Sequence, residues 1–310
     1  EGKGEPYFSN LGPACSTDLG RSWHWIGNPA QDFQSFRYTF PGGQNPVLFA
    51  SVIPYSGREL NQFLQHEAPR ELEIFTFSRS RGGATVPGFR ISPAGKRAAR
   101  SRVVVTARHH ACETMGSFVM EGLLSGWQPL DDAELVAIPF MDYDGVLAGE
   151  QGKNRSPHDH NRDYGDPPIY PEVAAMQALL GRKEPVYAVD LHCPYIIGED
   201  WNEHLYQVGL EDPEAARRQN RFGTLLESFA DGLPYHSTGD LPHGQAWNQA
   251  SNYSGGVSFG RYAASRPNSR LTTTLEIPYA LAGGVLVSPR RARRFGISLA
   301  RAIQAFIREG

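Results

Sequence analysis

The 310-residue chain has few cysteines, no long apolar run and no marked excess of charge of one sign. Three cysteines are too few for a disulfide framework. No apolar stretch approaches the ~20 residues that a membrane span requires, so we expect no membrane span. The 30 basic and 33 acidic residues give a net charge of −3, which offers no general attraction to nucleic acid.

The start of the chain leaves its compartment open. We find no signal peptide, but the chain begins at Glu1 without a methionine. A leader removed upstream would be compatible with secretion or a periplasmic location. We therefore expect a soluble protein whose compartment the sequence alone does not decide.

The pattern of expected secondary structure changes near residue 101. Residues 1 to about 45 are rich in Gly, Pro, Ser, Asn and aromatic residues, which indicates β or irregular structure. Strand-like runs alternate with helical ones further on, which is typical of α/β folds. We predict a mixed, mostly parallel sheet with helices on both faces in a domain of residues 66–310, preceded by a small β-rich domain of residues 1–65. The expected strands are 46–54, 72–77, 88–92, 102–107, 134–140, 186–191 and 271–277, and the expected helices are 57–66, 114–126, 171–182, 213–231 and 288–308.

A His-x-x-Glu pair stands at the end of one predicted strand. Three valines, Val103–Val105, lead toward His110 and Glu113, and a helix-period apolar pattern follows. Imidazole and carboxylate are both good zinc ligands. A polar loop on an α/β fold explains this fragment equally well when it is taken alone.

His192 supplies a third donor at the end of another predicted strand. It follows the apolar run that starts at Val186 and stands just before Pro194. With His110 and Glu113 it makes a His/Glu/His set that leaves a fourth position for water, as a catalytic zinc site requires.

The polar loop over residues 156–163 holds further candidates. His158 and His160 could themselves bind a metal, but no predicted strand supports them, so we leave both out of the ligand set. A metal-bound histidine commonly gives its second ring N–H to a carboxylate, and Asp159 is our candidate for His110.

Two more features of the sequence suit catalysis. Asn161 and Arg162 offer an amide and a planar pair of donors that suit a carboxylate. Glu276 is a single carboxylate inside an apolar strand-like run, where it is costly to bury unless it is used or paired. Near a metal, Glu276 could serve as a general base.

Together these residues resemble the zinc metallocarboxypeptidases of the carboxypeptidase A type over roughly residues 46–310. In that family a His-x-x-Glu pair, an Asn-Arg pair, a second His and a Glu on a late strand follow one another in this order. Three segments, 49–56, 144–146 and 190–192, are most similar to the cytosolic carboxypeptidase-like branch. That branch carries a small β-sandwich before its catalytic domain, so the resemblance implies a reduced or truncated sandwich in residues 1–65 and a cytoplasmic location.

The resemblance implies one zinc ion per chain, held by His110, Glu113 and His192. It makes Glu276 the base that activates the water at the metal, and Asp159 the carboxylate behind the metal ligands.

The same resemblance assigns residues to the substrate. Arg155 would polarise the scissile carbonyl and stabilise the oxyanion. Because Arg155 lies closer to Asn161 than is usual in the family, Lys153 remains an alternative for this role. Asn161 and Arg162 would hold the terminal carboxylate of the substrate.

The resemblance also points to the pocket for the terminal side chain. Tyr253 is the candidate for the tyrosine that caps the substrate, and Tyr262 is the second choice. The span that normally lines the pocket holds Arg261, Arg266 and Arg270, so we expect a lean toward acidic terminal residues.

Cys112 stands where carboxypeptidase A has an arginine, which removes one substrate contact. Cys112 and Cys193 each adjoin an expected ligand and are interpreted as small packing residues. A disulfide between them is possible only if their two loops meet closely.

Three alternative functions have weaker support than a carboxypeptidase. The run Gly256-Val-Ser-Phe-Gly260 matches the nucleophile elbow of serine hydrolases, but that fold needs a catalytic His after Ser258, and the last His is His243. A binding module derived from an enzyme would have lost Glu276 or a ligand, and all are present. An amidohydrolase that acts on N-acyl amino acids, resembling succinylglutamate desuccinylase, remains open.

We expect a zinc-dependent hydrolase that removes the C-terminal residue from peptides or proteins, with no nucleic-acid partner.

Overall fold

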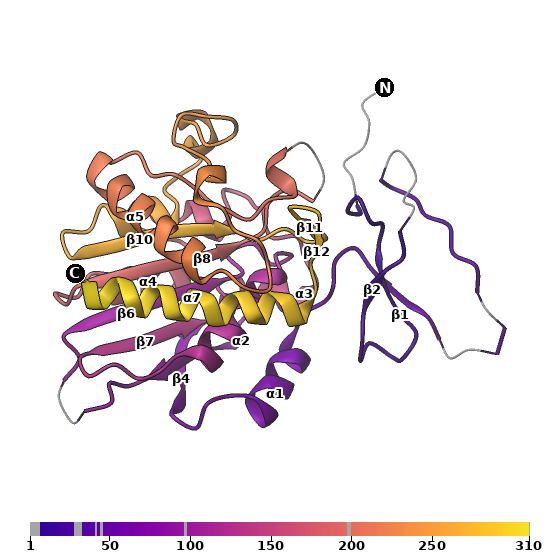
Figure 1. Cartoon of the computed structure of the whole chain (residues 1–310), viewed down its shortest axis with the longest axis horizontal. Helices are drawn as coiled ribbons and strands as arrows, with labels where there is room; N and C mark the ends of the chain where they lie inside the picture. The colour runs from indigo at the N-terminus through magenta and orange to yellow at the C-terminus, as the bar shows by residue number, and fades with distance from the viewer. Residues whose placement is uncertain are drawn as a thin grey trace.

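The computed structural model describes residues 7–27, 33–40, 42–43, 46–95, 98–196 and 200–309. Its centre is a seven-stranded sheet with the order β4-β5-β7-β6-β8-β10-β9. The four strands β7, β6, β8 and β10 are parallel to one another, whereas β5 and β9 run antiparallel to their neighbours. This confirms the predicted mixed α/β fold (Figure 1). The strands are β4 (Leu72–Arg79), β5 (Thr85–Ile91), β6 (Ser101–Ala107), β7 (Ala133–Ile138), β8 (Val186–His192), β9 (Tyr206–Gln207) and β10 (Ser269–Glu276).

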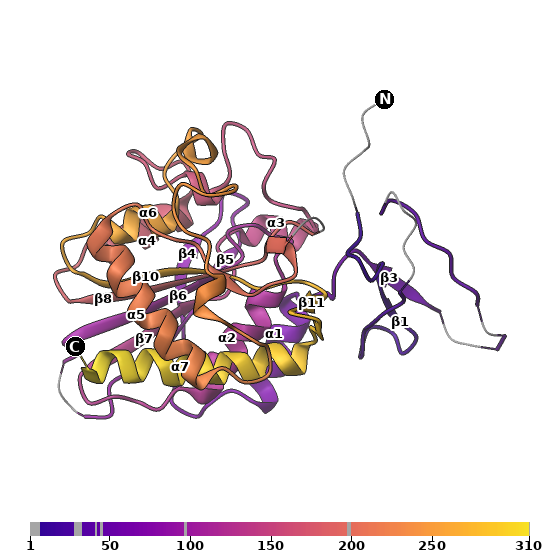
Figure 2. The same ribbon diagram turned by 45° about the horizontal axis from the view of Figure 1, so that its top comes forward.

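Helices cover both faces of this sheet (Figure 2). The side chains of β6 explain why, because they alternate between two apolar cores: Val103 and Val105 belong to one, and Val104 belongs to the other. Residues of α1, α2, α5 and α7 pack into the first core, and residues of α4 and α6 pack into the second. The helices are α1 (Gly57–His66), α2 (Met115–Gly126), α3 (Tyr143–Ala148), α4 (Pro171–Leu180), α5 (Pro213–Phe229), α6 (Phe259–Ala264) and α7 (Pro289–Glu309), and the 3₁₀ turns are η1 (His160–Arg162), η2 (Asp200–Asn202), η3 (Ser237–Gly239) and η4 (Ala250–Tyr253). Among the described residues, no helix has the length and apolar character needed to cross a membrane.

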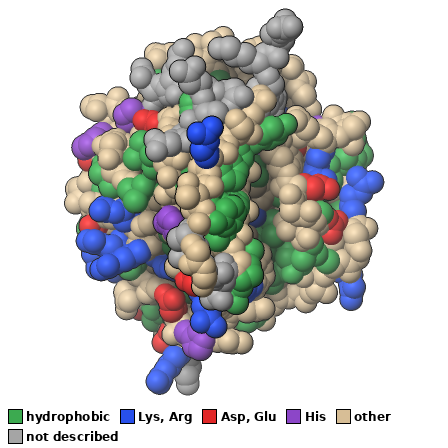
Figure 3. All heavy atoms as spheres, turned by 90° about the vertical axis from the view of Figure 1, so that its right-hand side faces the viewer, with side chains coloured by type: hydrophobic (Ala, Val, Ile, Leu, Met, Phe, Trp, Pro, Cys, Tyr) green, Lys and Arg blue, Asp and Glu red, His purple; other side chains and the backbone are tan. Residues whose placement is uncertain are grey.

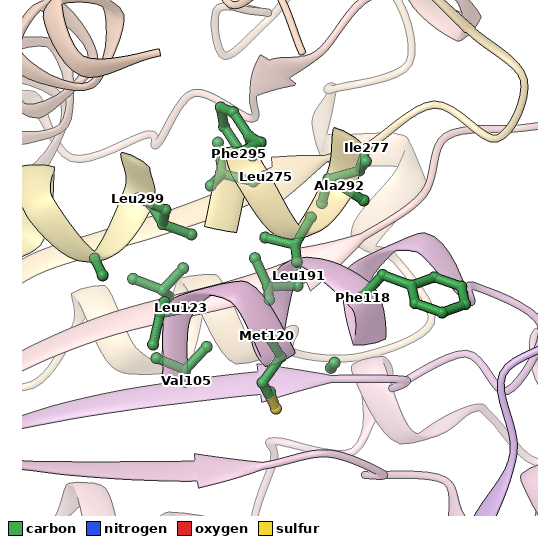
Figure 4. Close-up of a cluster of buried hydrophobic side chains, with 14 of the residues drawn as sticks. Val105, Phe118, Met120, Leu123, Leu191, Leu275, Ile277, Ala292, Phe295 and Leu299 are labelled. Carbon is green, nitrogen blue, oxygen red and sulfur yellow. The ribbon is translucent and has the colours of Figure 1, made fainter. Parts of the chain in front are cut away.

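Helices α2 and α7 lie side by side beneath the strand ends that carry the site. Figure 4 shows side chains of β6, β8 and β10 meeting those of the two helices. Two glycines permit the close approach, because a Cβ on Gly122 would lie 1.9 Å from the carbonyl oxygen of Arg293 and one on Gly296 would lie 2.0 Å from that of Val119. The position of α2 matters for the site because this helix begins two residues after Glu113.

The N-terminal segment forms a separate small sheet with the order β2-β1-β3. Figure 1 shows it beside the end of the large sheet. Its strands are β1 (Ala14–Ser16), β2 (His24–Trp25) and β3 (Leu48–Ala50), and a further short pair, β11 (Leu281–Ala282) and β12 (Val285–Leu286), lies outside both sheets.

Two expectations for residues 46–66 need comment. The strand expected over residues 46–54 is limited to β3, because Ile53 and Tyr55 beyond it are buried in the main core instead. Helix α1 has the predicted bounds, but its Leu60 and Phe63 also belong to the main core. The apolar residues of α1 thus share the main core with α2 and α7, and Ala14 of the small sheet belongs to this core as well.

Candidate metal centre and active site

Three neighbouring parallel strands deliver the candidate residues to one edge of the large sheet. β6 leads to His110, β8 ends at His192, and β10 ends at Glu276. β6 pairs with β8, and β8 pairs with β10, with Glu276 directly opposite His192. The carboxyl ends of parallel strands are the usual place for a site in such folds, because the connections open there.

The turn after β6 is held by the buried side chain of Arg108. This residue has a φ of 63°, a left-handed conformation that is uncommon for residues other than glycine. Its guanidinium donates from Nε to the carbonyl of Ala111 at 2.8 Å and from Nη1 to the carbonyl of Tyr55 at 2.9 Å. These bonds fix the turn, so that His110 and Glu113 lie against each other.

The two histidines converge on the carboxylate of Glu113. Nδ1 of His110 lies 2.8 Å from Oε1 of Glu113, and Nδ1 of His192 lies 2.7 Å from Oε2. The ligand atoms of the three residues all lie within 4.8 Å of one another. The expected set of His110, Glu113 and His192 is thus brought together in space.

The other ring nitrogen of each histidine faces a second carboxylate. Nε2 of His192 lies 2.8 Å from Oδ2 of Asp190, and Nε2 of His110 lies 3.6 Å from Oδ1 of Asp159. Such outer carboxylates orient an imidazole and leave its Nδ1 for a metal. The sequence interpretation proposed Asp159 as the partner of His110, but it missed Asp190 as the partner of His192. Its signal was the spacing in β8, since residues two apart in a strand share a face.

His109, to which the sequence assigned no role, lies behind this arrangement. Its Nδ1 is 2.9 Å from Oδ1 of Asp190, and its Nε2 is 2.8 Å from the hydroxyl of Tyr164. His109, Asp190 and His192 also meet the distance criterion for a metal group. Because His109 and Asp190 are completely buried, we interpret this group as a chain that holds His192 in place.

The electrostatics of the cluster suit a cation. Burial alone would lower the pKa of His192, but Asp190 and Glu113 raise it well above its ordinary value. Burial would raise the pKa of Glu113, yet Lys153, His110 and His192 hold it well below its usual range. The donor atoms, the outer carboxylates and the preference for positive charge together fit a metal ion.

Glu276 lies at the same strand edge in a different environment. It is 7% exposed, and its Oε2 has no hydrogen-bond partner among the described residues. Burial raises its pKa to about 7, and Glu113 adds to this rise, against the opposing effects of His192 and Lys153. A carboxyl group with a pKa near neutrality is suited to taking up and releasing a proton.

The structure separates the two cations that the sequence considered for the oxyanion. Arg155 pairs through Nη2 with Asp142 at 2.6 Å and Glu150 at 2.7 Å, and it lines a different cavity. Lys153 instead places Nζ 2.9 Å from Oε1 of Glu113 and lines the cavity that contains the cluster. Burial alone would lower the pKa of Lys153, but Glu113 and Glu276 hold it above its ordinary value. Lys153 therefore lies at the cluster, whereas Arg155 does not line the cavity that contains it.

A cavity of about 360 Å³ joins these groups to the expected substrate residues. Asn161 is held in place, because its Oδ1 accepts from the backbone N–H of Phe259 at 2.9 Å and its Nδ2 lies 3.2 Å from Nε2 of His192. The Arg162 guanidinium donates to two backbone carbonyls and, within the described residues, makes no ion pair. The ring of Tyr253 lies 5.2 Å from that guanidinium. Asn161, Arg162 and Tyr253 all line the cavity.

The remaining candidates lie outside the cavity. Arg261 stacks on Tyr253 at 4.0 Å and pairs with Glu211, whereas Arg266 donates to the hydroxyl of Tyr262. Arg270 lines a cavity with Tyr187 and Phe306 instead. The expected lean toward acidic residues rested on these arginines, and their positions give it no support.

His158 and His160 do not line the cavity that contains the cluster, whereas Cys193 does. His158 pairs with Asp163 at 2.7 Å, and His160 stacks on Tyr170 at 3.7 Å between ring centroids. Burial lowers the pKa of His160 to about 3. Cys112 and Cys193 are both free thiols.

Known proteins resemble this chain in sequence. No protein-family model matches the chain. Cytosolic carboxypeptidase 2 of Xenopus tropicalis is 27% identical over 218 residues, which cover 62% of this chain and 21% of that protein. Cytosolic carboxypeptidase 2 of Danio rerio is 29% identical over 214 residues, which cover 61% of this chain and 29% of the relative. The chain therefore spans less than a third of the length of these curated relatives.

A solved structure shows the shared fold over nearly the whole chain. The metallo-carboxypeptidase from Burkholderia cenocepacia superposes with a TM-score of 0.72 at 19% sequence identity, covering 99% of this chain and 82% of that one. The predicted resemblance to the metallocarboxypeptidases, and to the cytosolic carboxypeptidases in particular, is confirmed.

Proposed function

We propose that the protein is a zinc-dependent carboxypeptidase that removes the C-terminal residue from peptides or proteins. One observation carries the proposal: the His110, Glu113 and His192 donors line the same cavity as Glu276, Lys153 and Arg162. His110, Glu113 and His192 would hold one zinc ion, which when bound polarises a carbonyl and lowers the pKa of water. The names of the relatives support the choice of a carboxypeptidase.

Glu276 is the proposed general base. It takes a proton from the water whose oxygen attacks the scissile carbonyl carbon, and it passes this proton to the leaving nitrogen as the C–N bond breaks. The products are a shortened chain with a new carboxylate and a free amino acid. Its buried position and pKa of about 7 support this two-way proton transfer.

Lys153 is the proposed electrophile for the oxyanion, in place of Arg155. Its ammonium group lies at the metal cluster, where its positive charge can stabilise the negative charge that develops on the carbonyl oxygen. The carboxylates of Glu113 and Glu276 keep it protonated, so it can act as a hydrogen-bond donor throughout the reaction.

Arg162 is the proposed anchor for the terminal carboxylate of the substrate. Its guanidinium keeps donors that no carboxylate of the described residues occupies. The same cavity is also lined by Ser258, Thr274 and Val208, which are uncharged. We therefore propose that a neutral terminal side chain is accepted, rather than an acidic one.

The test is a library of peptides that differ only in the C-terminal residue, read by mass spectrometry with and without a chelator. We expect loss of a single residue, abolition by the chelator and restoration by zinc. Amidated peptides should resist. Cleavage of N-acyl amino acids with no cleavage of peptides would favour the amidohydrolase alternative, and hydrolysis that survives the chelator would overturn the proposal.

A further inference from the structure

A second hollow of about 690 Å³ adjoins the catalytic cavity. The two hollows share Lys153, Pro194 and Tyr195 in their walls, whereas Arg162 and Tyr253 line only the catalytic cavity. If Arg162 holds the C-terminal carboxylate, a substrate that extends from Arg162 across Lys153 reaches the second hollow at the shared residues. The hollow, called the upstream groove below, is therefore the continuation of the substrate path.

The walls of the upstream groove come from two parts of the chain. The stretch that leaves the small N-terminal sheet gives one side, including Ser51, Val52 and Pro54. Val146 of α3 and Ile196 after β8 give much of the rest. Figure 3 shows the side of the molecule on which the small N-terminal sheet lies, and hydrophobic side chains gather in a band down its middle. The groove thus offers apolar contact to an extended chain.

The charged groups of the groove are already engaged. The Arg108 guanidinium is 3% exposed and bonded to the backbone of Tyr55 and Ala111. Lys153 is paired with Glu113, and Glu150 is paired with Arg155. Among the described lining residues, an acidic substrate side chain would meet no cation that lacks a partner, and it would lose hydration against apolar walls.

We propose that the upstream groove binds the substrate residues before the scissile bond and selects polypeptides whose penultimate side chain is apolar rather than acidic. This proposal rests on the carboxypeptidase function proposed above. It also explains a role for the small N-terminal sheet, since the stretch beyond β3 supplies one wall of the groove.

The experiment compares three hexapeptides that differ only in the penultimate residue, which is Leu, Glu or Lys. Burial of a leucine side chain is expected to raise kcat/KM about tenfold or more over the other two. Equal values, or a preference for Glu, would overturn the inference while leaving the proposed function intact. Failure to cleave any of the three in a chelator-sensitive way would instead sink the proposed function.

A variant then ties the preference to the groove. Ser51 is exposed and lines the groove, so Ser51→Lys adds a cation without disturbing a core. The ratio of kcat/KM for the Glu peptide to that for the Leu peptide should rise about two- to fivefold. Thr224→Lys, on the exposed side of α5, is the matched control and should leave the ratio unchanged. Because a ratio does not depend on the fraction of active protein, an unchanged ratio in Ser51→Lys would count against the groove.

Discussion

The catalytic cavity and the upstream groove meet at Lys153 but are built in different ways. The metal donors and Glu276 lie at or just beyond the ends of three paired strands, so their positions follow the register of a buried sheet. The groove is made largely from segments outside that sheet, and its walls are mainly apolar. The difference indicates that the chemistry depends on the rigid sheet edge, and that the choice of substrate depends on the more variable connections around it.

The largest effect is expected from replacing Glu276, the proposed base in the catalytic cavity. Glu276→Gln keeps the shape of the side chain but cannot take a proton, so kcat should fall by about 10²–10⁴. Zinc content, measured by mass spectrometry of the metal, should be unchanged because Glu276 is not in the ligand set. Glu211→Gln on the surface is the control, and retained turnover in Glu276→Gln would exclude this residue as the base.

The next test separates the two cations of the loop at which the hollows meet. Lys153→Met removes the charge at the cluster, and kcat/KM should fall by about 10²–10³. Arg155→Met breaks its ion pairs with Asp142 and Glu150 and should leave kcat/KM within about threefold, because neither partner lines the cavity that contains the metal cluster. The reverse order of effects would return the oxyanion role to Arg155.

A smaller effect is expected at the far end of the cavity. Arg162→Ala should raise KM about 10- to 100-fold for peptides with a free C-terminal carboxylate, since a charged hydrogen bond contributes about 1.5–3 kcal/mol. Slow turnover of the amidated peptides should not change. A uniform loss with both kinds of peptide would mean that Arg162 supports the fold of the site and does not bind the carboxylate.

The smallest effect on activity should come from a third hollow, on the other side of the same loop. Glu172 lines it and is almost fully buried, and burial raises its pKa to about 7. A raised carboxyl pKa stabilises the fold below the unfolded pKa, and this stability is lost as the pH rises through 7. Wild-type protein should therefore lose about 1–3 kcal/mol relative to Glu172→Gln between pH 5 and pH 8, with no change in kcat/KM. Denaturant unfolding of both proteins at the two pH values measures this difference. An equal change in the free energy of unfolding of wild type and Glu172→Gln would show that ionisation of Glu172 does not destabilise the fold.

The site residues that could be predicted from the sequence are those whose spacing along the chain determines where their side chains point. His110 and Glu113 share one turn, and β-branched residues mark the strand before them, so their convergence follows from the chain itself. Lys153 and Arg155 lie in a loop, where spacing does not tell which side chain turns inward. Arg261 and Arg266 were misjudged for a similar reason, because the short helix α6 that carries Arg261 shows no periodicity in the sequence that would reveal its exposed side.

The helices and strands likewise fall into those that could be predicted from the sequence and those that could not. The long elements of the α/β sheet have strong periodic patterns and were predicted nearly to their ends. The short elements β9, α3 and α6 were missed, since two to six residues are too few to set a period. Of the small N-terminal sheet, only the region of β3 was predicted as a strand, because its strands of two or three residues are set by pairing across distant segments.

The central claim is that His110, Glu113 and His192 hold the metal that the reaction needs, and the zinc content of His110→Ala tests it most directly. His158→Ala is the matched control, since His158 lies outside the donor set and pairs with Asp163. Both proteins and the wild type are equilibrated with zinc, freed of unbound ion and analysed for metal per chain. The account predicts one equivalent in the wild type and in His158→Ala, and far less in His110→Ala. One full equivalent in His110→Ala would contradict it.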